Sequence, residues 1–239
     1  MGGRVQKRIL IGIQARSGST RLPRKAFELI GGKTMLDRVI EACKKAATYT
    51  AQREKTSIRV AVLTPEGDPI VEVFGNRCDI VEGPEQDVLT RYRMALDRYE
   101  SDYVVRITGD CPMIPPYVIS RIVSLAAQHS YDYISNVDER FRTSLDGIDC
   151  EVISARLLKE LHERAVSPSD REHVTTMARR DPPLWAKFGA VVNHFDQAHI
   201  KLSVDTPEDL ERVRDAYESA SGKYRDAIMT YGQTLVHVV

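Results

Sequence analysis

The sequence carries no excess charge of either sign, few cysteines and no long apolar run. Its 239 residues contain 34 Lys plus Arg against 34 Asp plus Glu, so the formal net charge is zero. Nucleic-acid binding proteins usually show a basic excess, and the balance argues against that class. No apolar run approaches the roughly 20 residues that cross a bilayer, and the N-terminus lacks the apolar core of a signal peptide. We therefore expect a cytoplasmic protein whose partners include neither nucleic acid nor a membrane.

The four cysteines are scattered and form no C-x-x-C pair. A disulfide framework or a zinc ribbon would need paired spacings, so reduced thiols are expected. Cys111 lies beside a candidate site, next to Pro112. A small packed side chain is the favoured interpretation of Cys111, ahead of a nucleophile.

Apolar runs rich in β-branched residues alternate with helical patterns. This is typical of an α/β protein with a mostly parallel sheet flanked by helices. The strand-like runs are residues 8–14, 58–63, 78–81, 102–107, 132–135, 147–153 and 190–195. Helical patterns follow Thr34, cover 88–99 and 115–129, and begin again at Ser167-Pro168 and Thr206-Pro207. We expect one domain over residues 1–239, in which the less regular span 137–195 is a lid, a dimerisation arm or an acceptor-binding insertion.

The most informative stretch follows the first predicted strand and reads QARSGSTRLPRK. Open α/β sheets bind ligands beyond the carboxyl ends of their strands. The small residues let the backbone approach a ligand, and the arginines and lysine could neutralise a triphosphate. A solvated basic loop is the alternative. The candidate nucleotide-binding residues here are Gln14, Ala15, Arg16, Ser17, Gly18, Ser19, Arg21 and Lys25.

Two familiar phosphate-binding motifs are absent. Gly31-Gly32-Lys33-Thr34 resembles the end of a Walker A loop, but the required first glycine would fall at Phe27. No G-x-G-x-x-G fingerprint follows the first strand. The two glycines are better interpreted as a turn before a helix capped by Thr34.

Two aspartates follow predicted extended segments, Asp110 in Thr108-Gly109-Asp110 and Asp205 in Val204-Asp205-Thr206. Both could face the edge of the sheet that carries the basic loop. Two carboxylates and a triphosphate supply the hard oxygen ligands that Mg²⁺ prefers. Asp110 could instead be a turn residue and Asp205 an acid favoured by the helix dipole. Because Thr206 and Asp209 already account for the helix cap, the metal-binding interpretation is favoured.

With these motifs, the chain resembles the cytidylyltransferases that make CMP-linked sugar acids, such as CMP-sialate and CMP-Kdo synthetases. It is most similar to the spore coat polysaccharide biosynthesis (SpsF) branch. The matching segments are IGIQARSGSTRLPRKAF, ITGDCPMI and SVDTPEDLERV, supported by GPEQDVLTRY, DGIDCEVIS and DREHVT.

The resemblance implies a three-layer α/β/α nucleotidyltransferase fold and a homodimer. It implies that CTP binds over the first loop and that Asp110 and Asp205 hold Mg²⁺. Arg16 and Lys25 would stabilise the reacting phosphates. The segment that lines the nucleotide pocket in relatives adds Gln86, Asp87, Arg91 and Thr108.

The acceptor is expected to meet the second half of the chain. Polar residues there could hold hydroxyl, amino, carboxylate or phosphate groups, although an exposed helix start and a polar strand face are equally compatible. The candidates are Asp146, Asp149, Glu151, Arg171 and His173, with Arg140 and Arg142 as weaker ones. A sugar acid, a phosphorylated polyol or amino acid, and a phosphonate all stay open.

Two other functions are compatible with such a site. A glycosyltransferase that uses a nucleotide-sugar donor would share the sheet and the metal, but it often carries an Asp-x-Asp pair that Thr108-Gly109-Asp110 does not provide. A non-catalytic nucleotide sensor would bind without turnover, which the complete basic loop and both aspartates argue against.

Overall fold

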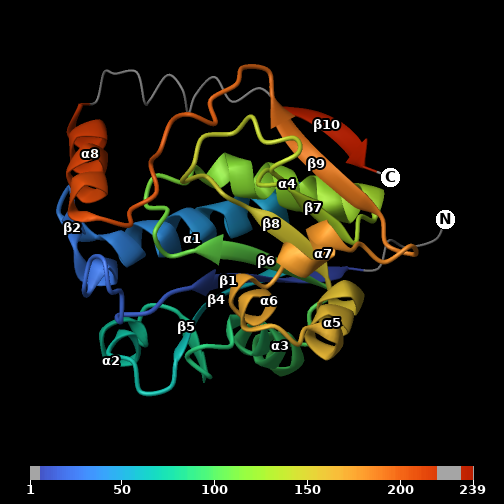
Figure 1. Cartoon of the computed structure of the whole chain (residues 1–239), viewed down its shortest axis with the longest axis horizontal. Helices are drawn as coiled ribbons and strands as arrows, with labels where there is room; N and C mark the ends of the chain where they lie inside the picture. Colours follow the sequence, from blue (N-terminus) through green and yellow to red (C-terminus); the bar gives the residue numbers. More distant parts are fainter. Residues whose placement is uncertain (1–5, 220–232, 239) are drawn as a thin grey trace.

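An eight-stranded sheet runs through the middle of the described chain (Figure 1). The structure, a computed structural model, describes residues 6–219 and 233–238. The strands of this sheet are β1 (Lys7–Gln14), β4 (Thr56–Pro65), β5 (Asp79–Gly83), β6 (Tyr103–Thr108), β7 (Tyr133–Ser135), β8 (Glu151–Ser154), β9 (Phe188–Asn193) and β10 (Gln233–Val238). Their order is β10-β9-β7-β8-β6-β1-β4-β5. Within it β8 and β10 run antiparallel to their neighbours, and the other pairs are parallel, as predicted.

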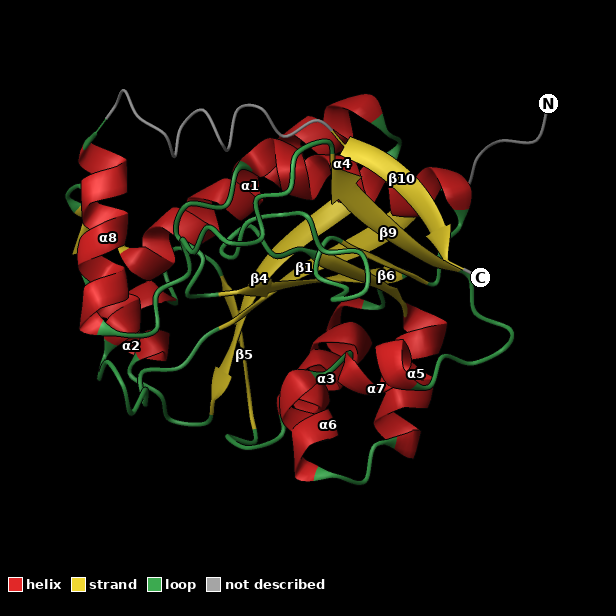
Figure 2. Cartoon of the chain, turned by 45° about the horizontal axis from the view of Figure 1, so that its top comes forward, coloured by secondary structure: helices red, strands yellow, loops and turns green. Residues whose placement is uncertain are grey.

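Helices cover both faces of the sheet (Figures 1 and 2). One face carries α1 (Met35–Arg53) and α4 (Pro116–His129). The opposite face carries α3 (Val88–Tyr99), α5 (Ala155–Arg164), α6 (Pro168–His173) and α7 (Thr176–Arg180). Helix α8 (Pro207–Glu218) lies at one side, against the hairpin of β2 (Leu29–Ile30) and β3 (Lys33–Thr34). The remaining elements are the short α2 (Ile70–Phe74) and the 3₁₀-helix η1 (Lys25–Phe27).

The alternation of side chains along β1 separates two hydrophobic cores. Ile9, Ile11 and Ile13 are buried in the core that includes α1 and α4. Leu10, on the opposite face, is buried with side chains from α3 and α5. Because successive strand residues point to opposite faces, one apolar strand supplies both layers. The predicted three-layer α/β/α architecture is therefore confirmed.

Three helices begin at the capping residues predicted from the sequence. Thr34 accepts a hydrogen bond from the backbone N of Asp37 at 3.1 Å, and Ser167 caps α6 in the same way. Thr206 and Asp209 form a reciprocal capping box at the start of α8. These side chains satisfy backbone N–H groups that the first helical turn leaves without intrahelical partners.

The second half of the chain contains elements that the sequence patterns did not resolve, namely α5, α7 and β10. In the predicted insertion at 137–195, β8 pairs with β6 in the interior of the sheet and β9 pairs with β7. These strands are therefore part of the central sheet, while a role of the span in dimerisation or acceptor binding stays a prediction. Among the described helices, none is both long and apolar enough to span a bilayer.

A tight contact near Gly147 generates a prediction about stability. Gly147 has a φ of 111°, and an added Cβ would lie 2.5 Å from the carbonyl carbon of Leu202 and 2.6 Å from the backbone N of Ser203. We expect Gly147→Ala to lower the free energy of unfolding by about 3 kcal/mol or more, because backbone strain and a steric clash combine. Urea unfolding followed by circular dichroism measures the change.

Gly67→Ala is the matched control, because Gly67 has a φ of 69° and open space where a Cβ would be. Gly67→Ala should lower the free energy of unfolding only by the backbone strain of an alanine at positive φ, about 1–2 kcal/mol. Equal losses in the two variants would show that the packing of Gly147 against Leu202 contributes nothing.

Candidate active site

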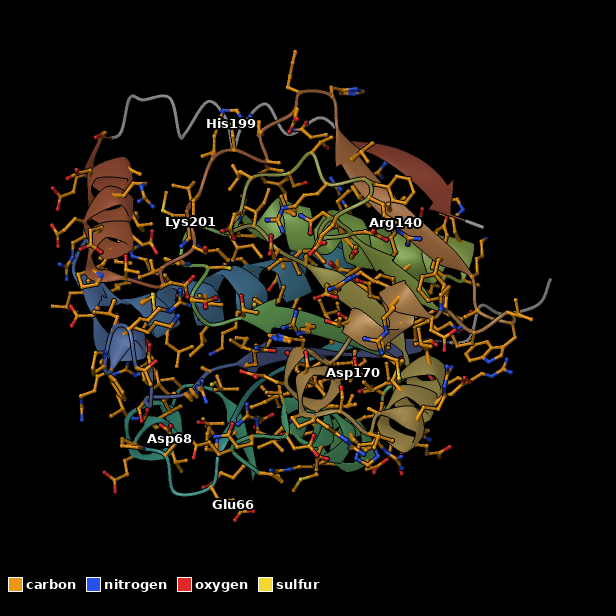
Figure 3. All side chains as sticks on the ribbon, in the orientation of Figure 1. Glu66, Asp68, Arg140, Asp170, His199 and Lys201 are labelled. Atoms are coloured by element: carbon orange, nitrogen blue, oxygen red, sulfur yellow. The ribbon has the colours of Figure 1, made fainter. Side chains whose placement is uncertain are left out.

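The basic loop after β1 is folded back and tied to a neighbouring loop. Ser17 donates from its backbone N and its Oγ to Oδ2 of Asp68, at 2.8 and 3.0 Å. Asp68 precedes α2 and is labelled in Figure 3. Arg24 has a φ of 60°, and its backbone N donates to the carbonyl oxygen of Ser17 at 3.0 Å. The closed loop places Lys25 at the start of η1, facing the end of β6.

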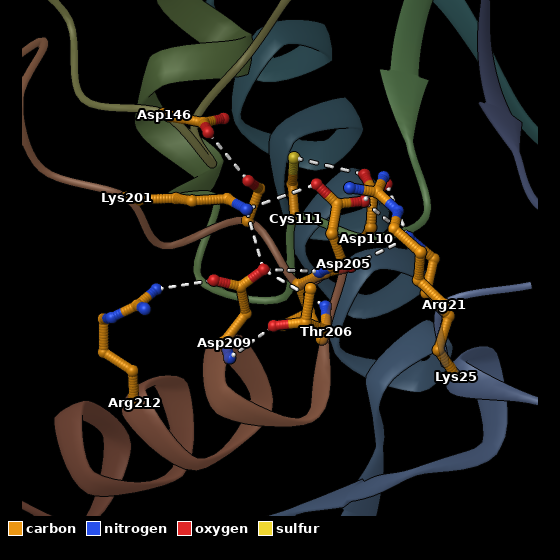
Figure 4. A network of polar contacts seen from close by, with 12 residues as sticks. Arg21, Lys25, Asp110, Cys111, Asp146, Lys201, Asp205, Thr206, Asp209 and Arg212 are labelled. Atoms are coloured by element: carbon orange, nitrogen blue, oxygen red, sulfur yellow. Dashed lines mark hydrogen bonds and ion pairs between the residues drawn. The ribbon is translucent and has the colours of Figure 1, made fainter. Parts of the chain in front are cut away.

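The ammonium group of Lys25 lies between the two predicted metal ligands (Figure 4). Its Nζ is 3.0 Å from Oδ2 of Asp110 and 3.2 Å from Oδ1 of Asp205. A third hydrogen bond joins Nζ to the carbonyl oxygen of Val204 at 2.8 Å. The fold therefore brings together three charged residues, Lys25, Asp110 and Asp205, that come from three separate motifs.

A glycine lets the ends of β1 and β6 approach each other beside this cluster. The backbone N of Gly109 donates to the carbonyl oxygen of Gln14 at 2.9 Å. A Cβ on Gly109 would lie 2.9 Å from Cβ of Ala15 and 3.1 Å from that carbonyl oxygen. Any larger residue would push Asp110 away from the basic loop, so the Gly-Asp order has a steric reason.

The environment keeps Asp110 ionised and the neighbouring thiol neutral. Burial alone would raise the pKa of Asp110, but Lys25 and a hydrogen bond from Thr108 outweigh burial and lower it. Burial and the charge of Asp110 raise the pKa of Cys111 well above its usual value. All four cysteines are free thiols, as predicted. Since the thiolate is the nucleophile, Cys111 is better suited to packing than to covalent chemistry.

The capping box of α8 positions Asp205. Oδ2 of Asp209 accepts from the backbone N of Asp205 at 3.0 Å and of Thr206 at 3.1 Å. The carboxylate of Asp205 therefore has no capping duty. Its Oδ1 lies 2.9 Å from the guanidinium of Arg21, and its Oδ2 lies 3.3 Å from Nζ of Lys201.

The donor set fits a magnesium ion. Two carboxylates and one carbonyl oxygen surround a single cationic group, and all are hard oxygen ligands of the kind that Mg²⁺ prefers. In the part of the chain that the structure describes, no group of three or more His, Cys, Asp or Glu side chains could hold a metal. A metal at Asp110 and Asp205 would therefore take its remaining ligands from water and a bound substrate.

Arg91 is a buried cation without a counter-ion. Its residue is 2% exposed, and it forms no ion pair with a carboxylate among the described residues. Its Nη1 makes long hydrogen bonds to the carbonyl oxygens of Pro84 and Glu85, at 3.3 and 3.4 Å, and its Nε has no partner. Burial lowers the pKa of Arg91, with a smaller lowering by the charge of Arg16, and these outweigh the raising effects of Tyr92, Asp68 and Glu85. Such a group favours an anionic ligand, because an unpaired buried charge is costly.

A cavity of about 310 Å³ joins these groups at the carboxyl ends of β1 and β6. Most of the residues predicted to bind a nucleotide or a metal line it, and so does one predicted acceptor residue, His173. The lining comprises Gln14, Ala15, Arg16, Ser19, Thr20, Arg21, Lys25, Ala26, Met35, Glu85, Gln86, Val88, Arg91, Thr108, Gly109, Asp110, Glu172, His173 and Asp205.

Four residues predicted for this region lie outside the cavity lining: Ser17, Gly18, Asp87 and Arg171. Asp87 caps α3 by accepting a hydrogen bond from the backbone N of Thr90 at 2.8 Å. Arg171 donates to the carbonyl oxygen of Ala165 at 2.9 Å and pairs with Asp87 at 3.4 Å. The contacts of Asp87 and Arg171 are compatible with a structural role at the start of α3. A direct contact of either residue with a substrate stays a prediction.

The three acids predicted to bind an acceptor also lie outside the cavity lining. Glu151 is 1% exposed and pairs with Arg106 and Arg179, while Tyr133 donates to it at 2.8 Å. Burial would raise the pKa of Glu151, but these arginines outweigh burial and lower it. Of the three acids, Glu151 is therefore the one for which a structural role fits best, in place of the predicted contact with an acceptor.

The other two acids belong to a neighbouring cluster. Asp149 pairs with Arg142 at 2.8 Å, and Asp146 accepts a hydrogen bond from Oγ of Ser203 at 2.9 Å. Burial raises the pKa of Asp149 to about 6, against the lowering effect of Arg142. Their contact with an acceptor stays a prediction.

Sequence reasoning missed several residues at the site. Glu85 and Glu172 line the cavity although only their neighbours were singled out. Arg106 connects the cavity to the buried acid, because its Nε donates to Oε1 of Gln14 at 2.9 Å while its Nη1 pairs with Glu151. Asp68 had no recognisable signal, since Gly67-Asp68-Pro69 has the composition of an ordinary turn.

An open α/β sheet whose strand ends gather a basic loop and two carboxylates around one cavity defines a nucleotide-handling enzyme. The chain belongs to the cytidylyltransferase family, whose family model matches residues 10–233. It is thus a CTP-dependent nucleotidyltransferase.

Two relatives of known name are similar over most of their length. The spore coat polysaccharide biosynthesis protein SpsF of Bacillus subtilis is 29% identical over 89% of this chain and 87% of its own. A 3-deoxy-manno-octulosonate cytidylyltransferase of Polynucleobacter asymbioticus is 33% identical over 92% of this chain and 86% of its own.

Solved structures agree with the fold. A cytidylyltransferase from Leptospira borgpetersenii has a TM-score of 0.78 and 28% identity, covering 94% of this chain and 93% of its own. A CMP:2-keto-3-deoxy-manno-octonic acid synthetase in complex with CTP has a TM-score of 0.66, covering 90% of this chain and 100% of its own. At 20% identity the second likeness supports the fold alone.

The unpaired guanidinium of Arg91 should favour nucleotide binding at the expense of stability. We expect Arg91→Met to raise the free energy of unfolding by about 1 kcal/mol or more and to weaken CTP binding at least about tenfold, because it removes a buried, uncompensated charge. Urea unfolding and calorimetric titration with CTP measure the two effects. Arg93→Met is the control, since Arg93 lies on the same helix and pairs with Asp97. A less stable Arg91→Met variant with unchanged CTP affinity would contradict this assignment.

The raised pKa of Asp149 predicts a pH dependence of stability. The native state holds this proton up to about pH 6, whereas the ordinary value is 3.8. Between those values the native state binds more protons than the unfolded state, so stability falls as pH rises, by at most about 1.4 kcal/mol per pH unit. Asn mimics the protonated acid, so Asp149→Asn should match the wild type near pH 4 and exceed it at pH 7. Parallel pH profiles for the two proteins in urea unfolding would refute this.

Proposed function

We propose that this enzyme transfers CMP from CTP to a small anionic acceptor and releases pyrophosphate. The observation that carries the proposal is that Arg16, Arg21, Lys25 and the buried Arg91 line the same cavity as the carboxylates of Asp110 and Asp205. Guanidinium and ammonium groups match the charge and geometry of a triphosphate.

In the proposed reaction an acceptor oxygen attacks the α-phosphorus of CTP in line. A new P–O bond forms to the acceptor while the bond to the bridging oxygen breaks, and pyrophosphate leaves with the electron pair. Arg16 and Lys25 stabilise the charge on the phosphate oxygens, and the loop tied to Asp68 holds the phosphates in position. The protein thus acts by positioning and electrostatics.

Asp110 and Asp205 are the residues that would hold Mg²⁺. When bound, this ion offsets negative charge on the phosphate oxygens. The low pKa of Asp110 supports its part in this role, because it stays an anion at neutral pH.

The proposed acceptor class is supported by the name of one relative and by one residue from the second half of the chain. One relative is named for a sugar acid, 3-deoxy-manno-octulosonate. We propose a sugar acid, a phosphorylated small molecule or a phosphonate, used in surface polysaccharide or glycoconjugate biosynthesis. His173 is the best-placed acceptor residue because it lines the cavity. The homodimer and the cytoplasmic location stay predictions.

The test is pyrophosphate release by the purified enzyme with Mg²⁺, each nucleoside triphosphate separately, and a panel of such acceptors. We expect release with CTP and one acceptor, and a loss of at least about a thousandfold in Asp110→Asn, because electrostatic stabilisation is the main catalytic term. Asp97→Asn, which removes a carboxylate from the exposed surface of α3, should retain full activity.

The pattern of failures discriminates among explanations. CTP binding without turnover for any panel member would count against the three acceptor classes and favour either another acceptor or a non-catalytic sensor. Loss of activity in Asp97→Asn would mean that net charge matters more than the site. Hydrolysis of a nucleotide-sugar without pyrophosphate release would overturn the proposal in favour of glycosyl transfer.

A further inference from the structure

Lys25 uses all of its hydrogen-bonding capacity inside the protein. An ammonium group has three N–H donors and no acceptor. In the structure the three donors go to Asp110, Asp205 and the carbonyl oxygen of Val204, at 3.0, 3.2 and 2.8 Å. The side chain is 17% exposed, so water does not compete strongly for these bonds. In this arrangement no N–H of Lys25 is left for a phosphate oxygen, although Lys25 lines the cavity.

The ammonium group also takes the position that a metal would need. A divalent cation at this site would be held by the carboxylates of Asp110 and Asp205. Nζ of Lys25 already occupies the space beside both carboxylates, within hydrogen-bond distance of each (Figure 4). Two cations cannot share this space, so the metal and the ammonium group exclude each other.

Neighbouring charges make metal binding without nucleotide still less favourable. Arg21 and Lys201 also contact Asp205, at 2.9 and 3.3 Å. Together with Lys25, three cationic side chains therefore meet two carboxylates. A divalent cation arriving alone would add two charges to a cluster that is already fully neutralised. A triphosphate in the same cavity would supply the missing negative charge and new acceptors for Lys25.

We propose that Lys25 is an exchangeable internal cation, which holds Asp110 and Asp205 together in the free enzyme and moves to the phosphates when a divalent metal arrives with CTP. This proposal rests on the proposed function for the identity of the nucleotide. Metal and nucleotide then bind with positive coupling, because each removes a competitor of the other. In the free enzyme the shared contact with Lys25 also keeps the two carboxylates beside each other before any metal is present.

The test is the affinity of the nucleotide-free, full-length protein for Mn²⁺, measured by electron paramagnetic resonance of the free ion. The wild type should bind Mn²⁺ weakly. Lys25→Met removes the internal cation and should bind Mn²⁺ about tenfold more tightly or better, within the usual range of coupling between ligands. Lys25→Gln, a neutral variant that keeps a donor for the carboxylates, should also bind Mn²⁺ more tightly than the wild type. It replaces Lys25→Met in the test if Lys25→Met does not fold.

Three controls assign the effect. Lys25→Arg keeps a cation at this position and should stay close to the wild type. Lys33→Met removes an exposed lysine that pairs with Glu41 outside the cavity lining, and should change nothing. The double variant Lys25→Met with Asp110→Asn should lose the gain, which locates the bound ion at the aspartate pair.

The opposite result overturns the exchange. If folded Lys25→Met or Lys25→Gln binds Mn²⁺ no more tightly than the wild type, Lys25 does not compete with the metal. Failure of the proposed function is seen separately, as no CTP binding to the wild type in a calorimetric titration. The nucleotide-free Mn²⁺ comparison is unaffected by that outcome.

Discussion

The contact of one ammonium group with two carboxylates holds the site together. Lys25 comes from the loop after β1, Asp110 from the end of β6 and Asp205 from the segment before α8. Each segment reaches the contact by a separate local device: the left-handed Arg24, the glycine at 109, and the capping box of Thr206 and Asp209. If the central contact were absent, two neighbouring carboxylates would repel each other and these devices would have no common target. The sheet and the contact of Lys25 with the two aspartates therefore determine together where the site lies.

Buried charge has two different uses in this fold. Glu151 is surrounded by Arg106, Arg179 and hydrogen-bond donors, so its charge is fully compensated and joins β6, β8 and α7. Arg91 is equally buried but has only two distant carbonyl oxygens as partners. A compensated buried ion is compatible with a structural role, whereas an uncompensated one is stabilised only when an anion arrives. On this basis Glu151 has a structural role, whereas Arg91 belongs to the surface that binds a ligand.

The local patterns of the sequence were sufficient to predict the fold class and to expect the basic loop beside the two aspartates. The alternating isoleucines of β1, the caps at Thr34 and Thr206, and the order of the Lys25, Asp110 and Asp205 motifs each have a short-range physical signature. The acceptor side could not be predicted in the same way, because it depends on strand register. Whether Glu151 faces substrate or arginines is decided by its pairing opposite Arg106 in a strand far away in the chain. Asp68, likewise, has a role only because a distant loop folds against it.

The reversed direction of β8 has a consequence for how such an enzyme can diversify. Because β8 runs against β6, the edge where β6 delivers Asp110 receives the segment before β8, not the segment after it. That segment contains Asp146 and Asp149, and its backbone pairs with residues just before Asp205. Substitutions or insertions there change the segment that pairs with residues 200–202, just before Asp205, without altering the register of any parallel strand. The topology thus separates the strand ends that carry the cavity, at β1 and β6, from a segment whose length can change without displacing those strands.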